Sequence, residues 1–216
     1  MKLTLIFLIL TCLFFINSIP STPRWPDQFE QSFTEKFSYA FLKGTTKGNF
    51  FYDWPTRRYR VDRENGKYDR FCGSIYKFQD TPCSHIVADG NRYLYFPDKN
   101  YCCKCCENKD GCGVLKPDWL EGGKFIDLEK DTNGVYLEKW DKPGMQSNFY
   151  WGVHSNVEEE RIMRRVDQVP NDMQDFDVSS FYRGIRDHKV FDLPSKCDPN
   201  FKCSWFSVCT ITRGLR

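Results

Sequence analysis

The feature that most constrains this chain is a cluster of cysteines in the segment 101–112, which reads YCCKCCENKDGC. Two adjacent pairs and a single cysteine fall within it, and such a density is typical either of disulfide bonds or of a metal site. In an extended segment adjacent side chains point to opposite faces, so we expect each pair to reach two different partners. Whether these cysteines form disulfides or bind a metal depends on the compartment in which the chain folds.

The N-terminus predicts an oxidising compartment. Lys2 is followed by an apolar run over 3–16, with Ser18 and Ser21 after it, which is the layout of a secretory signal peptide. We place this signal peptide at residues 1–20. The run is shorter than the roughly 20 residues that cross a bilayer, so we expect cleavage and no transmembrane segment in the mature chain. The expected location is outside the cell, or the lumen of the secretory pathway or lysosome.

The cysteine count supports a disulfide framework. Of eleven cysteines, Cys12 lies in the signal segment. An even number in an oxidising compartment predicts up to five bridges, whose pairing the spacing leaves open. Zinc is the alternative, because two Cys-x-x-Cys spacings overlap in the cluster. The predicted disulfide cysteines are Cys72, Cys83, Cys102, Cys103, Cys105, Cys106, Cys112, Cys197, Cys203 and Cys209, and the last three are natural partners for the cluster.

Alternation of aromatic and polar residues predicts an antiparallel β-sheet. Aromatic residues make up 17% of the chain, and around the turn at 55–56 they recur at every second position, the period of a strand. Strand pairs are predicted at 50–54 with 57–64, 85–88 with 92–96, 124–128 with 135–140, 148–154 with 161–168, and 175–181 with 189–193. The segment 28–41 suits a helix or a strand, and we favour a strand. A short helix is predicted at 116–120.

These patterns predict one disulfide-rich β domain over residues 21–216. The fold class is mainly β, an antiparallel meander forming a half-open barrel or a two-sheet sandwich, long enough for a sizeable core. A bent sheet with one aromatic face either packs that face solidly or leaves a cleft. The candidate lining of such a cleft is Phe50, Tyr52, Trp54, Tyr59, Leu94, Phe96, Phe149, Trp151 and Phe176.

No catalytic motif is present, and we expect a non-enzymatic protein without a cofactor. The three histidines, at 85, 154 and 188, lie in no thiol-protease motif, and every mature cysteine has a plausible partner. Calcium is a less favoured alternative: Asp172, Asp175 and Asp177 cluster, but they lack the spacing and glycine of an EF-hand loop. A net charge of +2 gives no indication of nucleic-acid binding.

Several motifs resemble the ependymin-related proteins: GNFFYDWPTRRYRVD at 48–62, HIVADGNRYLYFP at 85–97 and VFDLPSKC at 190–197. The blocks PCSHI, NYCCKCC, GVLKPDWL and QDFDVSSF are similar to uncharacterised cysteine-rich secreted proteins of protists. The resemblance implies a half-open barrel like that of bacterial lipoprotein carriers, the LolA-like superfamily, holding a hydrophobic ligand without catalytic residues. Homodimers and calcium binding are further expectations from the family. The denser cysteine cluster and the lack of an Asn-x-Ser/Thr sequon depart from it.

Two classes of function follow. The first is a secreted or lumenal protein that binds a hydrophobic small molecule, lipid above all, in an aromatic-lined cleft. The second is a structural, cell-surface or extracellular interaction protein with a filled core. A cavity lined by the aromatic face favours the first class, and a solid core favours the second.

Overall fold

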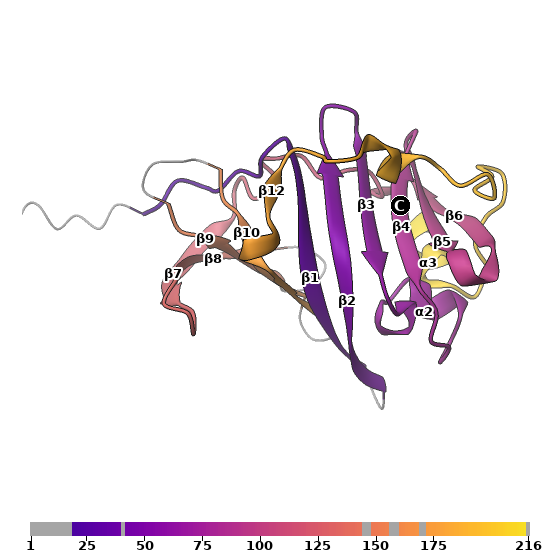
Figure 1. The fold of residues 1–216 in the computed structure, drawn as a ribbon, viewed down its shortest axis with the longest axis horizontal. Helices are drawn as coiled ribbons and strands as arrows, with labels where there is room; N and C mark the ends of the chain where they lie inside the picture. Colours follow the sequence, from indigo (N-terminus) through magenta and orange to yellow (C-terminus); the bar gives the residue numbers. More distant parts are fainter. Residues whose placement is uncertain (1–18, 40–41, 144–147, 156–159, 169–171, 215–216) are drawn as a thin grey trace, which may run out of the picture.

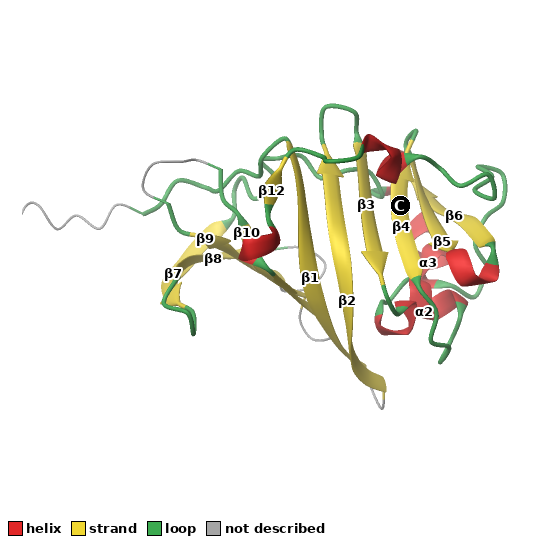
Figure 2. Cartoon of the chain, viewed as in Figure 1, coloured by secondary structure: helices red, strands yellow, loops and turns green. Residues whose placement is uncertain are grey.

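The structure is a computed structural model, and it describes residues 19–39, 42–143, 148–155, 160–168 and 172–214. Almost all of the predicted signal peptide lies outside the described residues. Within them, the chain forms one twelve-stranded antiparallel sheet that bends strongly and does not close (Figures 1 and 2). The predicted fold class is therefore confirmed. No helix in the described part is long and apolar enough to span a membrane.

The strands are β1 (Gln28–Tyr39), β2 (Leu42–Asp53), β3 (Arg58–Arg63), β4 (Cys83–Ala88), β5 (Asn91–Phe96), β6 (Tyr101–Glu107), β7 (Lys124–Lys130), β8 (Tyr136–Asp141), β9 (Asn148–Val153), β10 (Met163–Gln168), β11 (Asp172–Phe176) and β12 (Tyr182–Arg183). The α-helices are α2 (Cys72–Ile75) and α3 (Val208–Gly214). Five 3-10 turns are η1 (Gly66–Tyr68), η2 (Pro97–Lys99), η3 (Asn108–Asp110), η4 (Val178–Ser180) and η5 (His188–Phe191).

The sheet consists of two meanders joined at their long central strands. Its order is β6-β5-β4-β3-β2-β1-β11-β10-β9-β8-β7, with β12 paired to β1. The first meander runs outward from β1 to the edge strand β6, and the chain then crosses to the opposite edge, where β7 begins. The crossing segment, residues 108–123, therefore spans the open side of the bent sheet.

β1 is a strand although its phenylalanines suit a helix. Phe29, Phe33 and Phe37 are spaced by four, and four is also an even number, so a strand places all three on one face. All three are buried, and β1 pairs with β2 over its whole length and with β11 at Phe33–Phe37. The hydrogen bonds on both sides decide in favour of the strand.

Other predicted elements were wrong. β2 begins at Leu42, because it pairs with β1 far beyond the predicted start at 50. Residues 116–120 form turns, in which Trp119 N donates to Lys116 O at 3.1 Å. The segment 189–193 holds the end of η5 and no strand, since the Asp187 side chain caps that turn by accepting from Lys189 N at 3.0 Å. β11 likewise ends at Phe176, before η4.

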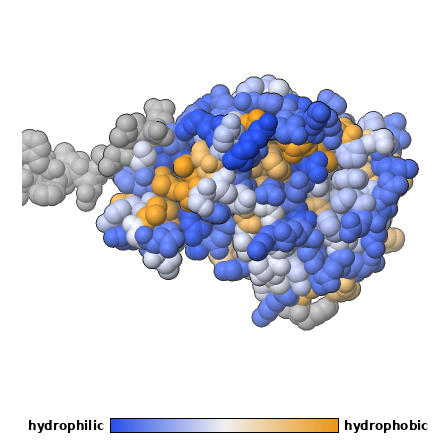
Figure 3. Space-filling view, viewed as in Figure 1, coloured by the Kyte–Doolittle hydropathy of each residue, from blue (hydrophilic) through white to orange (hydrophobic). Residues whose placement is uncertain are grey.

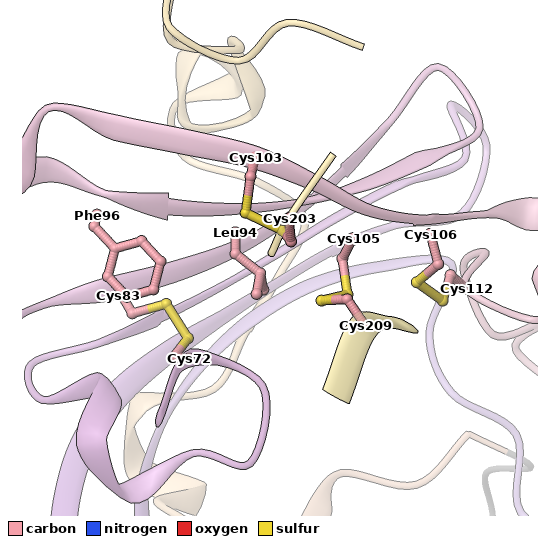
Figure 4. Packing of buried hydrophobic residues seen from close by; sticks show 10 residues of the cluster. All are labelled: Cys72, Cys83, Leu94, Phe96, Cys103, Cys105, Cys106, Cys112, Cys203 and Cys209. Carbon is pink, nitrogen blue, oxygen red and sulfur yellow. A yellow bond between two sulfur atoms is a disulfide. The ribbon is translucent and has the colours of Figure 1, made fainter. Parts of the chain in front are cut away.

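All ten cysteines of the described part form disulfides: Cys72–Cys83, Cys102–Cys197, Cys103–Cys203, Cys105–Cys209 and Cys106–Cys112. Three of them fasten the C-terminal segment to β6, and eight of the ten sulfurs, with Leu94 and Phe96, form one buried cluster (Figure 4). Because every sulfur of the YCCKCCENKDGC segment is bonded to another sulfur, none is available as a zinc ligand.

The expected alternation of the paired cysteines holds for one pair only. Cys102 packs with Ile86 and Tyr93, whereas Cys103 lies in the sulfur cluster on the other face. Cys105 and Cys106 both lie in the sulfur cluster. The register of β5 against β6 shifts at Arg92/Tyr93, so a bulge interrupts the alternation of β6 there.

Gly48, in the middle of β2, gives a test of packing at the centre of the sheet. A Cβ atom here would overlap the Asp62 carbonyl and the Phe33 ring. We expect Gly48→Ala to lower the free energy of unfolding by about 1–3 kcal/mol, the usual cost of overpacking. Urea denaturation would measure it. Gly214→Ala is the control, since nothing lies near that position; an equal effect of both substitutions would contradict the expectation.

Candidate functional site

The concave side of the bent sheet lines a partly open cavity of about 270 Å³. Its lining comes from strands as far apart in the sheet as β5 and β9, which is possible only because the sheet curls around it. The lining residues are Trp25, Phe50, Tyr52, Tyr59, Val61, Arg63, Asp69, Arg70, Phe71, His85, Arg92, Gly111, Gly113, Leu115, Trp119, Tyr150, Met163, Val166, Gln168, Asp172, Gln174 and Phe176. Outside, hydrophilic side chains cover most of the face in Figure 3, with hydrophobic patches between them.

The crossing segment 108–123 closes part of the open side. The Tyr52 hydroxyl donates to Leu115 O at 2.7 Å, and Trp25 N donates to Pro117 O at 2.9 Å. The ring of Trp119 lies with its centroid 4.1 Å from that of Tyr150. These contacts tie the segment to both halves of the sheet, so the cavity has a cover that belongs to the chain itself.

One part of the cavity wall is aromatic. The Phe50 ring lies 6.0 Å from Trp25, 6.1 Å from Tyr59 and 6.2 Å from Phe176, measured between ring centroids. Burial raises the pKa of Tyr150 to about 12. Its hydroxyl is therefore neutral at physiological pH, and this part of the wall carries no charge.

The other part of the wall is a buried ionic cluster. The Arg63 guanidinium forms two hydrogen bonds with the Glu35 carboxylate, the longer at 3.2 Å, and lies 3.4 Å from Asp69. His85 Nε2 lies 2.9 Å from Asp69 Oδ1, and Gln174 donates to Glu35 at 3.2 Å. The bidentate geometry and the additional partners are what allow charges to exist in an interior of low polarity.

The protonation states of this cluster follow from burial and from Arg63. Burial lowers the pKa of His85 and so favours its neutral form. Burial works against the charged form of Asp69, but Arg63 and His85 outweigh it and hold the Asp69 pKa below its usual range. Burial and the neighbouring Glu35 raise the pKa of Asp172 to about 9. At neutral pH, Asp172 is therefore protonated and Asp69 is ionised.

Four polar atoms on lining residues are buried and have no hydrogen-bond partner among the described residues of the protein. They are Arg63 Nη1, Arg92 Nε, Trp119 Nε1 and Asp172 Oδ1. Three of the four are N–H donors. Buried donors are almost always satisfied in folded proteins, so this gathering around one cavity distinguishes it from an ordinary packing defect.

The structure brings four of the nine predicted cleft residues to the cavity: Phe50, Tyr52, Tyr59 and Phe176. The remaining five do not line it. Leu94 and Phe96 pack in the sulfur cluster, where the disulfides and α2 fill the space. The Arg57 guanidinium lies over Trp54, with its carbon atom 3.2 Å from the centroid of the Trp54 ring.

Phe149 and Trp151 lie outside this lining, and the strand period explains why. They flank Tyr150 on β9, so when Tyr150 faces the cavity its neighbours face away. Lys139 Nζ lies 5.3 Å from the Phe149 ring centroid and 5.0 Å from that of Trp151.

Sequence reasoning missed the polar half of the site. Its signal is a charged residue at an inward position of an otherwise apolar strand face: Glu35 follows Phe29 and Phe33 on β1, and Arg63 follows Val61 on β3. An inward charge on a central strand is rare unless a partner or a ligand meets it. The lining residues of the crossing segment, such as Trp119, carry no comparable signal.

The three aspartates considered for calcium do not converge. Asp172 interacts with Glu35, Asp175 accepts from Arg165 Nε at 2.6 Å, and Asp177 caps η4 by accepting from Ser179 N at 2.9 Å. Among the described residues, the one group with metal-site spacing is Cys72, Cys83 and His85. Its two sulfurs are bonded to each other, so they are not thiolate ligands.

A Cys–His dyad is likewise not assembled in the described residues, because each cysteine there is in a disulfide. His154 Nδ1 instead lies 2.7 Å from the buried Glu138, whose carboxylate also accepts from Arg161 Nε at 3.0 Å. This second ionic cluster lies outside the cavity lining.

Three solved structures among those similar to this chain are distant likenesses. An uncharacterized conserved protein from Thermus thermophilus is 6% identical, with a TM-score of 0.47 over 82% of this chain and 89% of that one. A protein from Vibrio parahaemolyticus, described as a putative outer membrane lipoprotein-sorting protein domain, is 6% identical, with a TM-score of 0.39 over 76% of this chain and 89% of that one. A DUF1329 family protein from Desulfovibrio piger is 8% identical, with a TM-score of 0.39 over 80% of this chain and 92% of that one.

TM-scores below 0.5 do not establish a common fold. No family model matches the sequence, and no curated protein matches it significantly.

Proposed function

We propose that this protein is a secreted or lumenal binding protein that holds a hydrophobic ligand in the cavity of its bent sheet and does not transform it. The observation that carries the proposal is the cavity of about 270 Å³ with an aromatic wall, close to the lower end of the usual range for ligand sites. The resemblance of the hairpin at 48–62 to ependymin-related proteins, and through them to lipoprotein carriers, agrees with this proposal and stays a prediction.

The disulfides support the compartment. Five bridges in one domain form and persist where the medium is oxidising, as outside the cell or in the secretory pathway. They also fix the β6 end of the sheet through buried sulfur, so one end of the cavity wall is rigid. A preformed site of this kind loses less entropy when a ligand binds.

Filling the cavity tests the proposal. Val166 lies on the wall, and Val166→Trp would occupy part of the space that a ligand needs. We expect the wild-type protein to carry an apolar molecule in native mass spectrometry, and the variant to carry at least about tenfold less, since about 1.4 kcal/mol of lost burial suffices for that.

Leu128→Trp is the matched control, because Leu128 is exposed on β7 and does not line the cavity. Circular dichroism would first establish that both variants fold. The proposal would be contradicted if Val166→Trp retained as much ligand as Leu128→Trp, or if the wild-type protein bound no apolar molecule.

A second candidate function is that of an extracellular interaction protein. Trp205 and Phe206 are 76% and 86% exposed beside the sulfur cluster, and exposed large apolar side chains mark contact surfaces. The two functions differ in one result: an interaction protein would lose partner binding on Trp205→Ser with Phe206→Ser, and Val166→Trp would leave that binding unchanged.

A further inference from the structure

The polar wall of the cavity indicates what kind of head group a ligand should have. This inference rests on the function proposed above. The donors without partners on the wall are Arg63 Nη1, Arg92 Nε and Trp119 Nε1. Donors in excess of acceptors call for a ligand that supplies acceptors.

The charges on the wall also favour a ligand that supplies hydrogen-bond acceptors. Arg63 is matched by the carboxylates of Glu35 and Asp69. Arg70 and Arg92 also line the cavity, and neither forms an ion pair with any residue in the described part of the chain. The remaining carboxyl group, that of Asp172, is neutral because burial and Glu35 raise its pKa to about 9. The wall therefore has a net positive charge.

Arg92 is held in a position where it can meet a ligand. Its guanidinium carbon lies 5.7 Å from the ring centroid of Tyr59 and 5.7 Å from that of Phe71. Both rings also line the cavity. Arg63 and Arg92 each act electrostatically on Tyr59 and His85, so the two positive charges influence the same part of the wall.

The volume limits the apolar part of the ligand. At about 270 Å³ the cavity lies near the lower end of the usual range for ligand sites, so it suits a ligand with one short alkyl chain. A single alkyl chain is therefore favoured over a lipid with two long acyl chains.

We propose that the cavity binds a single-chain amphiphile with an anionic head group, whose chain lies along Phe50, Tyr150 and Phe176 and whose head group accepts hydrogen bonds from Arg92 and Arg63. The head group is a carboxylate or a chemically similar monoanion. The aromatic wall and the arginines then form two ends of one site.

Three ligands with the same chain separate this inference from the proposed function. Decanoate, 1-decanol and decyltrimethylammonium share a ten-carbon chain and differ in head-group charge. We expect isothermal titration at neutral pH to show decanoate binding at least about tenfold more tightly than either of the others, since hydrogen bonds to a charged group contribute about 1.5–3 kcal/mol.

Arg92→Met keeps much of the length of the side chain and removes its charge and donors. We expect it to weaken decanoate binding by about 10–100-fold and decanol binding by less than about threefold. Arg57→Met is the matched control, because Arg57 is exposed and lies outside the cavity lining. If Arg92→Met does not fold, Arg70→Met tests the same wall.

The outcomes are distinct. Equal binding of decanoate and decanol by the wild-type protein, or tighter binding of the ammonium compound, would overturn the anionic head group and leave the proposed function standing. Binding of none of the three would overturn both. Loss of decanoate binding in Arg57→Met as well as Arg92→Met would show that charge anywhere on the protein, and not this wall, is responsible.

Discussion

Replacing Arg63 with methionine is expected to lower the free energy of unfolding by about 3–5 kcal/mol, as removal of one partner from a buried ionic cluster does. Arg63 is 6% exposed, and its guanidinium is shared between Glu35 and Asp69, which are 0% and 4% exposed. Without it, two carboxylates would face each other across the interior with no counter-charge. Urea denaturation followed by circular dichroism would measure the loss.

The loss of stability in Arg63→Met is expected to come from the missing charge of the arginine, and not from its missing volume. Arg165→Met removes an arginine that pairs with Asp175 at the surface, where such pairs contribute about 0–1 kcal/mol, and it serves as control. Adding Glu35→Gln to Arg63→Met should recover part of the stability, because one unpaired carboxylate is removed. In Arg63→Met, protonation neutralises the carboxylates that have lost their counter-charge. The difference in free energy of unfolding between this variant and the wild type should therefore shrink as the pH falls below about 5. A deficit independent of pH and of Glu35 would contradict this explanation.

Removing the three bridges that hold the C-terminal segment to β6 is expected to lower the free energy of unfolding by more than Arg63→Met does. Cys102–Cys197, Cys103–Cys203 and Cys105–Cys209 join residues 95, 100 and 104 positions apart. A loop of this length, once closed, removes chain entropy equivalent to about 4.7 kcal/mol. The second and third bridges close much shorter effective loops, because the first already holds the segments together, and each adds about 2.5 kcal/mol.

The expected loss of stability therefore grows with the number of bridges removed. Replacing one of these cystines with two alanines should cost about 2.5 kcal/mol, whereas replacing all three should cost about 10 kcal/mol, as much as the usual stability of a domain, leaving β6 and α3 unfolded. Hydrogen exchange at β6 and urea denaturation would show this. Cys106–Cys112 is the control, since its partners are only 6 positions apart and its loss leaves the C-terminal segment attached. Equal costs for one bridge and for all three would show that the chain-entropy account fails here.

The sequence predicts the strands well where their signal is local. The hairpin β2–β3 and the pair β4–β5 follow from alternation around a short turn, because both strands are adjacent in the chain. The sequence does not predict the pairing of β1 with β11, which joins strands at opposite ends of the chain. That single contact decides that there are two meanders, and hence that the crossing segment spans the open side.

A local signal likewise places three of the residues considered for a cleft on the cavity wall. Phe50, Tyr52 and Tyr59 share a face because of alternation within one hairpin. The ionic half depends on register between strands: Glu35 on β1 reaches Arg63 on β3, with β2 between them, and Gly48 of β2 is the residue paired with Arg63. No spacing within one strand records which residue of the next strand lies beside it.

The long separation of the β6 bridges also sets an order of events during synthesis. The thiols of β6 leave the ribosome about 100 residues before those of the C-terminal segment, an interval of about 5–20 s at typical elongation rates. In that interval only Cys72–Cys83 and Cys106–Cys112 have both native partners available. Any other bond formed among the early cysteines is non-native and has to be reopened by thiol–disulfide exchange, a step that takes seconds to hours, before this half of the molecule reaches its native pairing.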